Sequence, residues 1–330
     1  MIESHFPKLT IESLNSNTLN LMFTNIHFSF LNTLRRIIKQ DIPMLAINKI
    51  RFEKYSGYMN EEMLAHRLSL IPIVCKNIDK VSYEKNCICD VGCKFCNVDF
   101  SLEKKSSDHA LNVYSNDLKL SNPNNEYGTE ILQFVKNYHG ILLCRLNPYE
   151  EIKLECTAVK GTAKQHAKFS ASTVCFYKKR NHNSYSFTLE TNENINPLDV
   201  FRLALEIFIK ESMSLKKYIN KSMTINNVNI KVPYQDTLLN SLQKEITETF
   251  EDKIDLFFYK KSHILSEYPH SELEFHFDDT DQSCLDVKEH VKTSINRLII
   301  FSEMIISELN EKKLNIKIEG LQSKKRFVSN

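Results

Sequence analysis

The first organised stretch of the chain is an amphipathic pattern over residues 28–40. Its polar side carries Asn32, Arg35 and Arg36, and its apolar side repeats at the i, i+3, i+4, i+7 spacing of one helix face: Phe30, Leu31, Leu34, Ile37 and Ile38. The pattern predicts a helix that ends at Asp41-Ile42-Pro43, because proline lacks a backbone donor and disfavours helical geometry in the residue before it. The two arginines are consistent with an ordinary solvated face or with a docking surface.

A second helix is predicted from Asn60 to Ile71-Pro72. The Asn60 side chain can accept from the free amides of the first turn, and two glutamates follow it where negative charge complements the helix dipole. Its buried side is predicted to consist of three apolar residues, Met63, Leu64 and Leu68.

Alternation of apolar and polar residues predicts strands at 18–23, 46–55, 152–156, 228–232 and 273–277. Three further helices are predicted, from Asn196-Pro197 to about residue 220, from Asp236 to about 250, and from about 283 to 309. Asn240-Ser241-Leu242 follows its strand at nearly the spacing by which Asn32-Thr33-Leu34 follows the strand at 18–23. This correspondence indicates an internal repeat.

The strongest chemical signal is a C-x-C-x3-C-x2-C run formed by Cys87, Cys89, Cys93 and Cys96. Four thiolates in ten residues can surround one tetrahedral Zn²⁺, and Gly92 permits a tight turn between them. A disulfide framework is the first alternative, but the other five cysteines are scattered singly among apolar residues. An iron–sulfur cluster is the second, but the ferredoxin spacing is absent. We therefore expect one structural zinc per chain.

Composition narrows the class of protein. The 330 residues are 42% hydrophobic and 25% charged, an ordinary globular mixture, and the net charge of only +2 disfavours a protein that binds mainly by neutralising nucleic-acid phosphates. The N-terminus shows no signal-peptide pattern and no apolar run is long enough to span a bilayer, so we expect a soluble, intracellular protein.

The stretches NTLRR, DIPMLAI and NEEMLAHRLSLIPI, together with the four-cysteine run and the loop KGTAKQHAK at 160–168, resemble the RNA polymerase assembly subunits. These are bacterial alpha, archaeal D and the third-largest subunit of eukaryotic polymerase II. The resemblance implies that polymerase subunits dock on Asn32, Arg35, Arg36, His66, Arg67, Lys164, His166 and Lys168. From the charge pattern alone, the loop at 160–168 is also consistent with a solvated basic loop.

The C-terminal half, with DTLLNSL, FFYKKSHIL, ELEFHFDD and the final long helix, resembles the eleventh subunit of polymerase II and archaeal L. The resemblance implies an α+β fold: two dimerisation-type domains fused as an intramolecular pseudo-dimer, with an inserted, mainly β, zinc-binding domain. The expected boundaries are 1–41 with 171–222, 42–170 for the insert, 223–310, and a tail at 311–330. The expected pseudo-dimer interface contains Leu34, Leu205, Phe208, Leu242, Ile295 and Leu298.

The function that this resemblance implies is a non-catalytic assembly platform of a DNA-directed RNA polymerase. Expected partners are the largest and second-largest subunits and small zinc-bearing subunits, with DNA reached only through the complex, no self-dimer and no membrane. Fusions of this kind are known from large DNA viruses, so we expect a viral factory in the host cytoplasm, with packaging in the virion as an option, or otherwise the nucleus. The alternative function is a free-standing zinc-containing nucleic-acid-binding protein, although few basic residues surround the cysteines. A catalytic role for the acidic run at 278–281 is disfavoured, because such a run before a helix complements its dipole.

Overall fold

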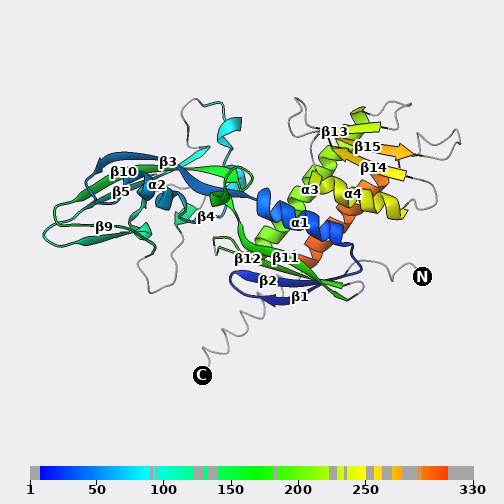
Figure 1. Cartoon of the computed structure of the whole chain (residues 1–330), viewed down its shortest axis with the longest axis horizontal. Helices are drawn as coiled ribbons and strands as arrows, with labels where there is room; N and C mark the ends of the chain where they lie inside the picture. Colours follow the sequence, from blue (N-terminus) through cyan, green and yellow to red (C-terminus); the bar gives the residue numbers. More distant parts are fainter. Residues whose placement is uncertain are drawn as a thin grey trace, which may run out of the picture. The chain divides into compact units, whose positions relative to one another are not determined.

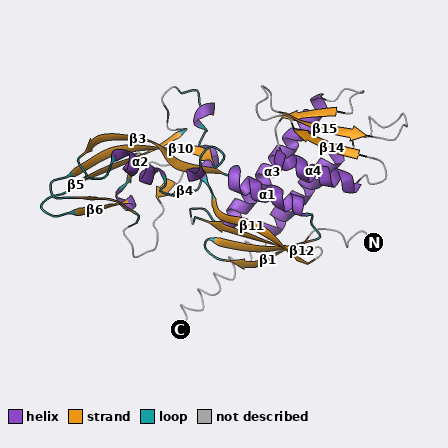
Figure 2. Ribbon diagram, viewed as in Figure 1, coloured by secondary structure: helices purple, strands orange, loops and turns teal. Residues whose placement is uncertain are grey.

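A computed structural model of the chain describes residues 8–89, 92–93, 95–121, 129–131, 140–181, 184–192, 194–222, 229–233, 236–249, 256–261, 270–276, 289 and 291–310. The chain divides into two compact units. We call Met1–Ile38, Val174–Leu189 and Pro197–Asn330 the helical unit, and Lys39–Thr173 with Glu190–Asn196 the insert unit. Figure 1 shows the elements of both, and Figure 2 separates helices from strands by colour.

The described residues of the helical unit form two sheets. The first has the strand order β1-β2-β12-β11, with β1 at Lys8–Leu14, β2 at Thr18–Thr24, β12 at Ser184–Thr191 and β11 at Ser172–Asn181. The second has the order β13-β15-β14, with β13 at Asn229–Pro233, β15 at His270–His276 and β14 at Leu256–Lys261. The strands predicted near 18–23, 228–232 and 273–277 are confirmed as β2, β13 and β15.

In the part of this unit that the structure describes, four helices accompany the sheets: α1 (Phe28–Gln40), α3 (Pro197–Ser222), α4 (Asp236–Thr249) and a final helix over residues 291–310. The predicted ends of α1 and the proline start of α3 are confirmed. Phe23, Phe187 and Phe201 meet in the core, with ring centroids 5.6–6.3 Å apart. Phe30 of α1 contacts Phe208 of α3 at 5.2 Å and Phe301 of the final helix at 5.0 Å. Phe30 therefore joins α1, α3 and the final helix in one apolar core.

The same order of elements occurs twice in the helical unit. The first series is β2, α1, β11, β12 and α3, and the second is β13, α4, β14, β15 and the helix at 291–310. In each sheet the first strand of the series lies beside the last, since β2 neighbours β12 and β13 neighbours β15. The repeat seen in the sequence is thus matched by a repeat in topology.

The insert unit is built on a sheet of order β3-β10-β5-β7. These strands are β3 (Pro43–Tyr55), β10 (Glu151–Thr162), β5 (Asn97–Lys105) and β7 (Lys119–Leu120). Two small sheets, β4 (Ile73–Cys75) with β8 (Thr129–Ile131) and β6 (Leu111–Tyr114) with β9 (Leu142–Leu146), and the helix α2 (Glu61–Ser69) complete it. The short 3-10 helices are η2 (Ile78–Lys80), η3 (Glu84–Asn86), η4 (Ser115–Asp117) and η5 (Ala167–Phe169).

Helix α2 packs on the insert sheet through a narrower stripe than the sequence predicted. Leu64 and Leu68 are fully buried in the insert core, and Asn60 caps the helix by accepting from the Glu62 amide at 2.8 Å, as predicted. Met63, however, is 63% exposed, so its assignment to the buried side was wrong. Only the i, i+4 pair reaches the core of so short a helix, and Met63 points away from it.

Three other predictions change or fall outside the described residues. The loop predicted at 160–168 begins later, because β10 continues to Thr162 and the remainder forms a turn and η5. The predicted tail at 311–330 and the acidic run at 278–281 lie outside the part of the chain that the structure describes.

Candidate metal centre and docking surfaces

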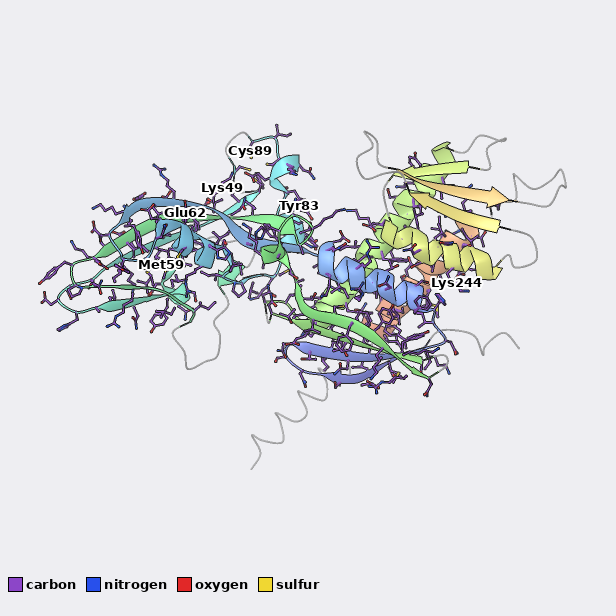
Figure 3. The ribbon with its side chains drawn as sticks, in the orientation of Figure 1. Lys49, Met59, Glu62, Tyr83, Cys89 and Lys244 are labelled. Atoms are coloured by element: carbon purple, nitrogen blue, oxygen red, sulfur yellow. The ribbon has the colours of Figure 1, made fainter. Side chains whose placement is uncertain are left out.

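The four predicted metal ligands lie together in the loop between η3 and β5 of the insert unit. Cys87 directly follows η3, and its amide donates to the Glu84 carbonyl at 3.3 Å. Cys96 directly precedes β5, and the amides of Cys96 and Asn97 both donate to the Cys93 carbonyl, at 3.0 and 2.9 Å. Backbone hydrogen bonds thus fix both ends of the loop. Cys89 is labelled in Figure 3, in the same part of the unit as Lys49 and Tyr83.

The sulfur positions fit one tetrahedral ion. The Sγ–Sγ distances are 3.3 Å for Cys87–Cys89, 3.5 Å for Cys87–Cys93 and Cys89–Cys96, and 3.8 Å for Cys93–Cys96. All four sulfurs lie within 4.8 Å of one another. Four sulfurs about 2.3 Å from a central Zn²⁺ would be separated by about 3.8 Å. The cluster could therefore hold a metal ion with four sulfur ligands and no open coordination position.

Gly92 provides the turn that brings the two cysteine pairs together. Its φ of +105° lies in a region that side chains rarely adopt, and a Cβ placed there would lie 2.0 Å from Nδ2 of Asn97. The sequence indicates only that this glycine permits a turn, and the structure shows that both its backbone conformation and the Asn97 side chain exclude a larger residue.

The thiols perturb one another's protonation. A hydrogen bond with the Phe95 backbone, helped by the neighbouring thiols, lowers the pKa of Cys93 to about 7. Hydrogen bonds with Cys87 and then Cys96 raise the pKa of Cys89 to about 12, and burial raises that of Cys96. If all four thiols lost their protons, the thiolates would repel one another at these distances unless a cation lay between them. The charge of nearby Lys49 is already paired with Glu84.

The predicted docking residues of the helical unit lie on the half-buried side of α1. Both Nε and one terminal nitrogen of Arg35 donate to Oδ1 of Asn32, at 3.2 and 2.9 Å. Arg36 is also half-buried. The bond within the helix pre-orders the Arg35 guanidinium without burying it.

The five predicted docking residues of the insert unit divide into two groups. His66, Lys164 and His166 are exposed, although Nδ1 of His166 accepts from the Lys168 amide and thereby caps η5. Arg67, though exposed, donates to the carbonyls of Leu142 and Leu143 at 2.6 and 3.1 Å. Lys168 donates to the Ile47 carbonyl and to Oδ1 of Asn48 at 3.0 and 2.8 Å, and burial lowers its pKa. Arg67 and Lys168 thus connect segments of the insert unit itself.

All six residues predicted for the pseudo-dimer interface are buried in the helical unit: Leu34, Leu205, Phe208, Leu242, Ile295 and Leu298. Sequence reasoning missed a polar contact in their midst. Oγ1 of Thr33 lies 2.6 Å from Oγ of Ser241, and both hydroxyls also approach the Ser29 carbonyl, at 3.0 and 3.3 Å. Thr33 and Ser241 occupy equivalent positions in the two repeats, so the repeat itself contained the signal.

Comparison with known proteins gives matches to RNA polymerase subunits. Residues 37–175 match the family model described as the RNA polymerase Rpb3/RpoA insert domain. The chain is 36% identical over 190 residues to DNA-directed RNA polymerase II subunit RPB3 of Schizosaccharomyces pombe, covering 54% of this chain and 63% of that protein. It is 40% identical over 153 residues to DNA-directed RNA polymerase subunit Rpo3 of Methanosphaera stadtmanae, covering 46% of this chain and 53% of that protein.

These matches span little more than half the length of the curated relatives, and the family match lies over the unit that contains the cysteine cluster. No helix among the described residues is long and apolar enough to cross a membrane. Residues 37–175 are thus similar to the RNA polymerase Rpb3/RpoA insert domain, and about half of the chain is similar to DNA-directed RNA polymerase subunits.

Proposed function

We propose that the chain is a non-catalytic assembly subunit of a multisubunit DNA-directed RNA polymerase. The observation that carries the proposal is the match of residues 37–175 to the polymerase insert domain, together with similarity to polymerase subunits over about half of the chain. The cysteine cluster agrees with this function, because a metal held by four sulfurs has no open position at which to activate water or a phosphate.

The proposed role of the metal is structural, with one Zn²⁺ held by Cys87, Cys89, Cys93 and Cys96. Sulfur separations of 3.3–3.8 Å support zinc, since they lie close to the edges of a tetrahedron of four sulfurs around zinc. Because Cys96 is adjacent to β5, the ion would tie the loop to the central sheet of the insert unit. It would contribute to folding of that unit and would take no part in nucleotide addition.

The helical unit is proposed to be an intramolecular pseudo-dimer, in which the second repeat plays the part of a small partner subunit. Support comes from the repeated order of elements and from the Thr33–Ser241 contact. In a symmetric dimer, a residue contacts its own counterpart in the other subunit only at the two-fold axis. Thr33 and Ser241 are counterparts in the two repeats, and their contact is the one expected at such an axis. The fusion makes this association unimolecular, with an effective concentration of order millimolar. Residues 1–41 with 171–222 and residues 223–310 would be the two halves, and 42–170 the insert.

Docking of the two largest polymerase subunits is proposed for the surface residues predicted from the sequence. Arg36, His66, Lys164 and His166 are the better candidates, since each is at least partly exposed, whereas two others, Arg67 and Lys168, already donate to carbonyls of distant segments. Arg35 can also serve, because Asn32 holds its guanidinium in place and leaves the other terminal nitrogen for a partner. Small zinc-bearing subunits are proposed as further partners. For Arg67 and Lys168 we propose a role in stabilising the insert unit ahead of a role in docking.

An intracellular location follows from this proposal. We also predict that the source is a large DNA virus and that the protein is located in the viral factory of the host cytoplasm or in the virion. The alternative is a free-standing zinc nucleic-acid-binding protein. Such a protein would need basic side chains near the cysteine loop that are free to contact phosphates. Here Lys49 is paired with Glu84, and Lys160 donates to the carbonyls of Ile78 and Val81. The polymerase function is therefore preferred.

Reconstitution tests the two functions against each other. The full zinc-loaded chain, alone, should neither extend RNA nor shift duplex DNA. Co-expression with the two largest subunits of the polymerase from the same source should give one complex that synthesises RNA, and omission of this chain should prevent that complex from forming. A complex that assembles equally well without the chain, or a shift of DNA by the chain alone, would reject the assembly function.

A further inference from the structure

The two edges of the first sheet differ in the side chains that they expose. On β1, the exposed residues are all polar: Lys8, Thr10, Glu12 and Ser13. On β11, Val174 and Phe176 are 38% and 46% exposed, while Cys175 between them is buried. Successive side chains of a strand point to opposite faces, so Val174 and Phe176 form an apolar stripe on the outer face of an edge strand. Within the described sheet β11 has a neighbour, β12, on one side only.

The same face of β11 continues into basic residues. Lys178 and Arg180 follow Val174 and Phe176 at the two-residue period, and both are exposed, as is Lys179. Arg180 is held in place, since its Nε donates to Oγ of Ser186 on β12 at 3.2 Å. The outer face of β11 therefore presents two apolar side chains followed by two cations along one line.

Edge strands expose backbone donors and acceptors to which another chain can pair, and proteins commonly protect them with lysine. Here the charges protect only one half of β11 and leave the apolar half uncovered. If β11 paired in parallel with β11 of a second copy, Lys178 and Arg180 would lie opposite their own counterparts, and like charges across paired strands are destabilising. If it paired antiparallel, the two cations of each copy would lie opposite Val174 and Phe176 of the other and would gain no opposite charge. The charge pattern thus disfavours a second copy and favours an acidic partner.

We propose that β11 is a strand-addition site for an extended segment of a partner polypeptide. On the outer face of the sheet, that segment would present two apolar side chains to Val174 and Phe176. On the same face it would present two carboxylates to Lys178 and Arg180. Main-chain hydrogen bonds would supply affinity, and the apolar and acidic positions would supply selectivity, as is general for strand addition. This inference concerns the helical unit alone and does not depend on the polymerase assignment.

The experiment uses the full zinc-loaded chain and blocked, fluorescent peptides. The two acidic probes are Glu-Thr-Glu-Thr-Val-Thr-Val and its reverse, because the segment can run in either direction, and the counter-probes carry lysine in place of glutamate. We expect saturable binding of one acidic probe, no saturable binding of either lysine probe, and slower amide exchange over residues 174–180 in the complex. We expect Phe176→Lys to weaken binding at least tenfold, and Lys178→Glu/Arg180→Glu to transfer binding to a lysine probe.

Thr10→Lys, an exposed position on the opposite edge strand, is the matched control and should leave the affinity unchanged. Circular dichroism checks that each variant is folded, and Val174→Thr replaces Phe176→Lys if the latter is not. The proposal is overturned if neither acidic probe saturates at about 1 mM, a dissociation constant worth only about 4 kcal/mol. Equal binding of the lysine probes, protection outside β11, or a dimer that Phe176→Lys abolishes would also overturn it.

Discussion

Replacing Thr33 with valine is expected to loosen the contact between α1 and α4. The Thr33 hydroxyl lies 2.6 Å from that of Ser241 and donates to the Ser29 carbonyl at 3.0 Å. Both residues are buried, at 1% and 3% exposure, so water cannot replace the lost bonds. Valine keeps the shape of threonine but leaves Ser241 with one partner, the Ser29 carbonyl at 3.3 Å.

The expected cost follows from what each variant leaves unpaired. A buried hydroxyl without a partner costs about 1–3 kcal/mol, but Ser241 retains one bond, so Thr33→Val should cost about 1 kcal/mol. Ser241→Ala should cost a similar amount, since Thr33 retains its bond to Ser29. The double variant should cost less than the sum, by about 0.5–1 kcal/mol, because the bond between the hydroxyls can be lost only once.

Native-state amide exchange measured by mass spectrometry can localise this effect. A loss of about 1 kcal/mol should speed exchange about fivefold in peptides from α1 and α4. Peptides from β10, in the insert unit, should keep their rates. Ser302→Ala is the matched control, because Ser302 is a fully buried serine that donates to the Leu298 carbonyl of its own helix at 2.8 Å. Unchanged exchange in α1 and α4, or full additivity of Thr33→Val and Ser241→Ala, would refute the proposed coupling of the repeats.

Four further outcomes are expected. Purified protein should contain one zinc, and chelation or Cys93→Ser should speed exchange in β5 while α1 and α4 keep theirs; iron in elemental analysis would contradict this. Burial raises the pKa of Cys156 from 9.0 to about 12, so the folded state holds this proton more tightly than the unfolded one. The stabilisation from Cys156 is complete below pH 9 and is lost as pH rises toward 12, so Cys156→Ala should flatten the decline of the melting temperature over that range. Arg35→Ala/Arg36→Ala should leave the melting temperature nearly unchanged but reduce co-purification with the second-largest polymerase subunit more than tenfold, since truncating one side of an interfacial charge pair costs about 2–5 kcal/mol; a large fall in melting temperature would assign these arginines to the fold. Light scattering should show a monomer, because a second copy would have to displace the second repeat from α1, and a stable symmetric dimer at micromolar concentration would be inconsistent with that arrangement.

Local signals were sufficient to predict the helices and the grouping of the four cysteines. Asn60 caps α2, and Pro43 and Pro197 mark element boundaries, because caps and prolines act within a few residues. The four cysteines could be grouped for the same reason, since short spacers alone limit how far the sulfurs can separate.

Contacts between distant segments could not be predicted in this way. The docking roles of Arg67 and Lys168 stay predictions, but the sequence did not indicate that these side chains also donate to carbonyls 76 and 121 positions away. Long side chains can span several ångströms to any backbone group nearby, and spacing along a helix does not say which group that is. The predicted burial of Met63 was wrong for a related reason, because the burial of a helix residue depends on what lies beside the helix, here α2.

Because β3 pairs with β10, the insert begins and ends at neighbouring positions. Pro43, the first residue of β3, lies opposite Thr162, the last residue of β10, and the Lys164 amide donates to the Gln40 carbonyl at 3.0 Å. Paired strands lie about 4.8 Å apart, so the chain leaves for the sheet of the insert unit and returns from it at neighbouring positions. A tight turn could join these two ends directly. The whole segment could thus have been gained in one insertion event, and could be exchanged or deleted, with no change in the order or direction of the elements on either side.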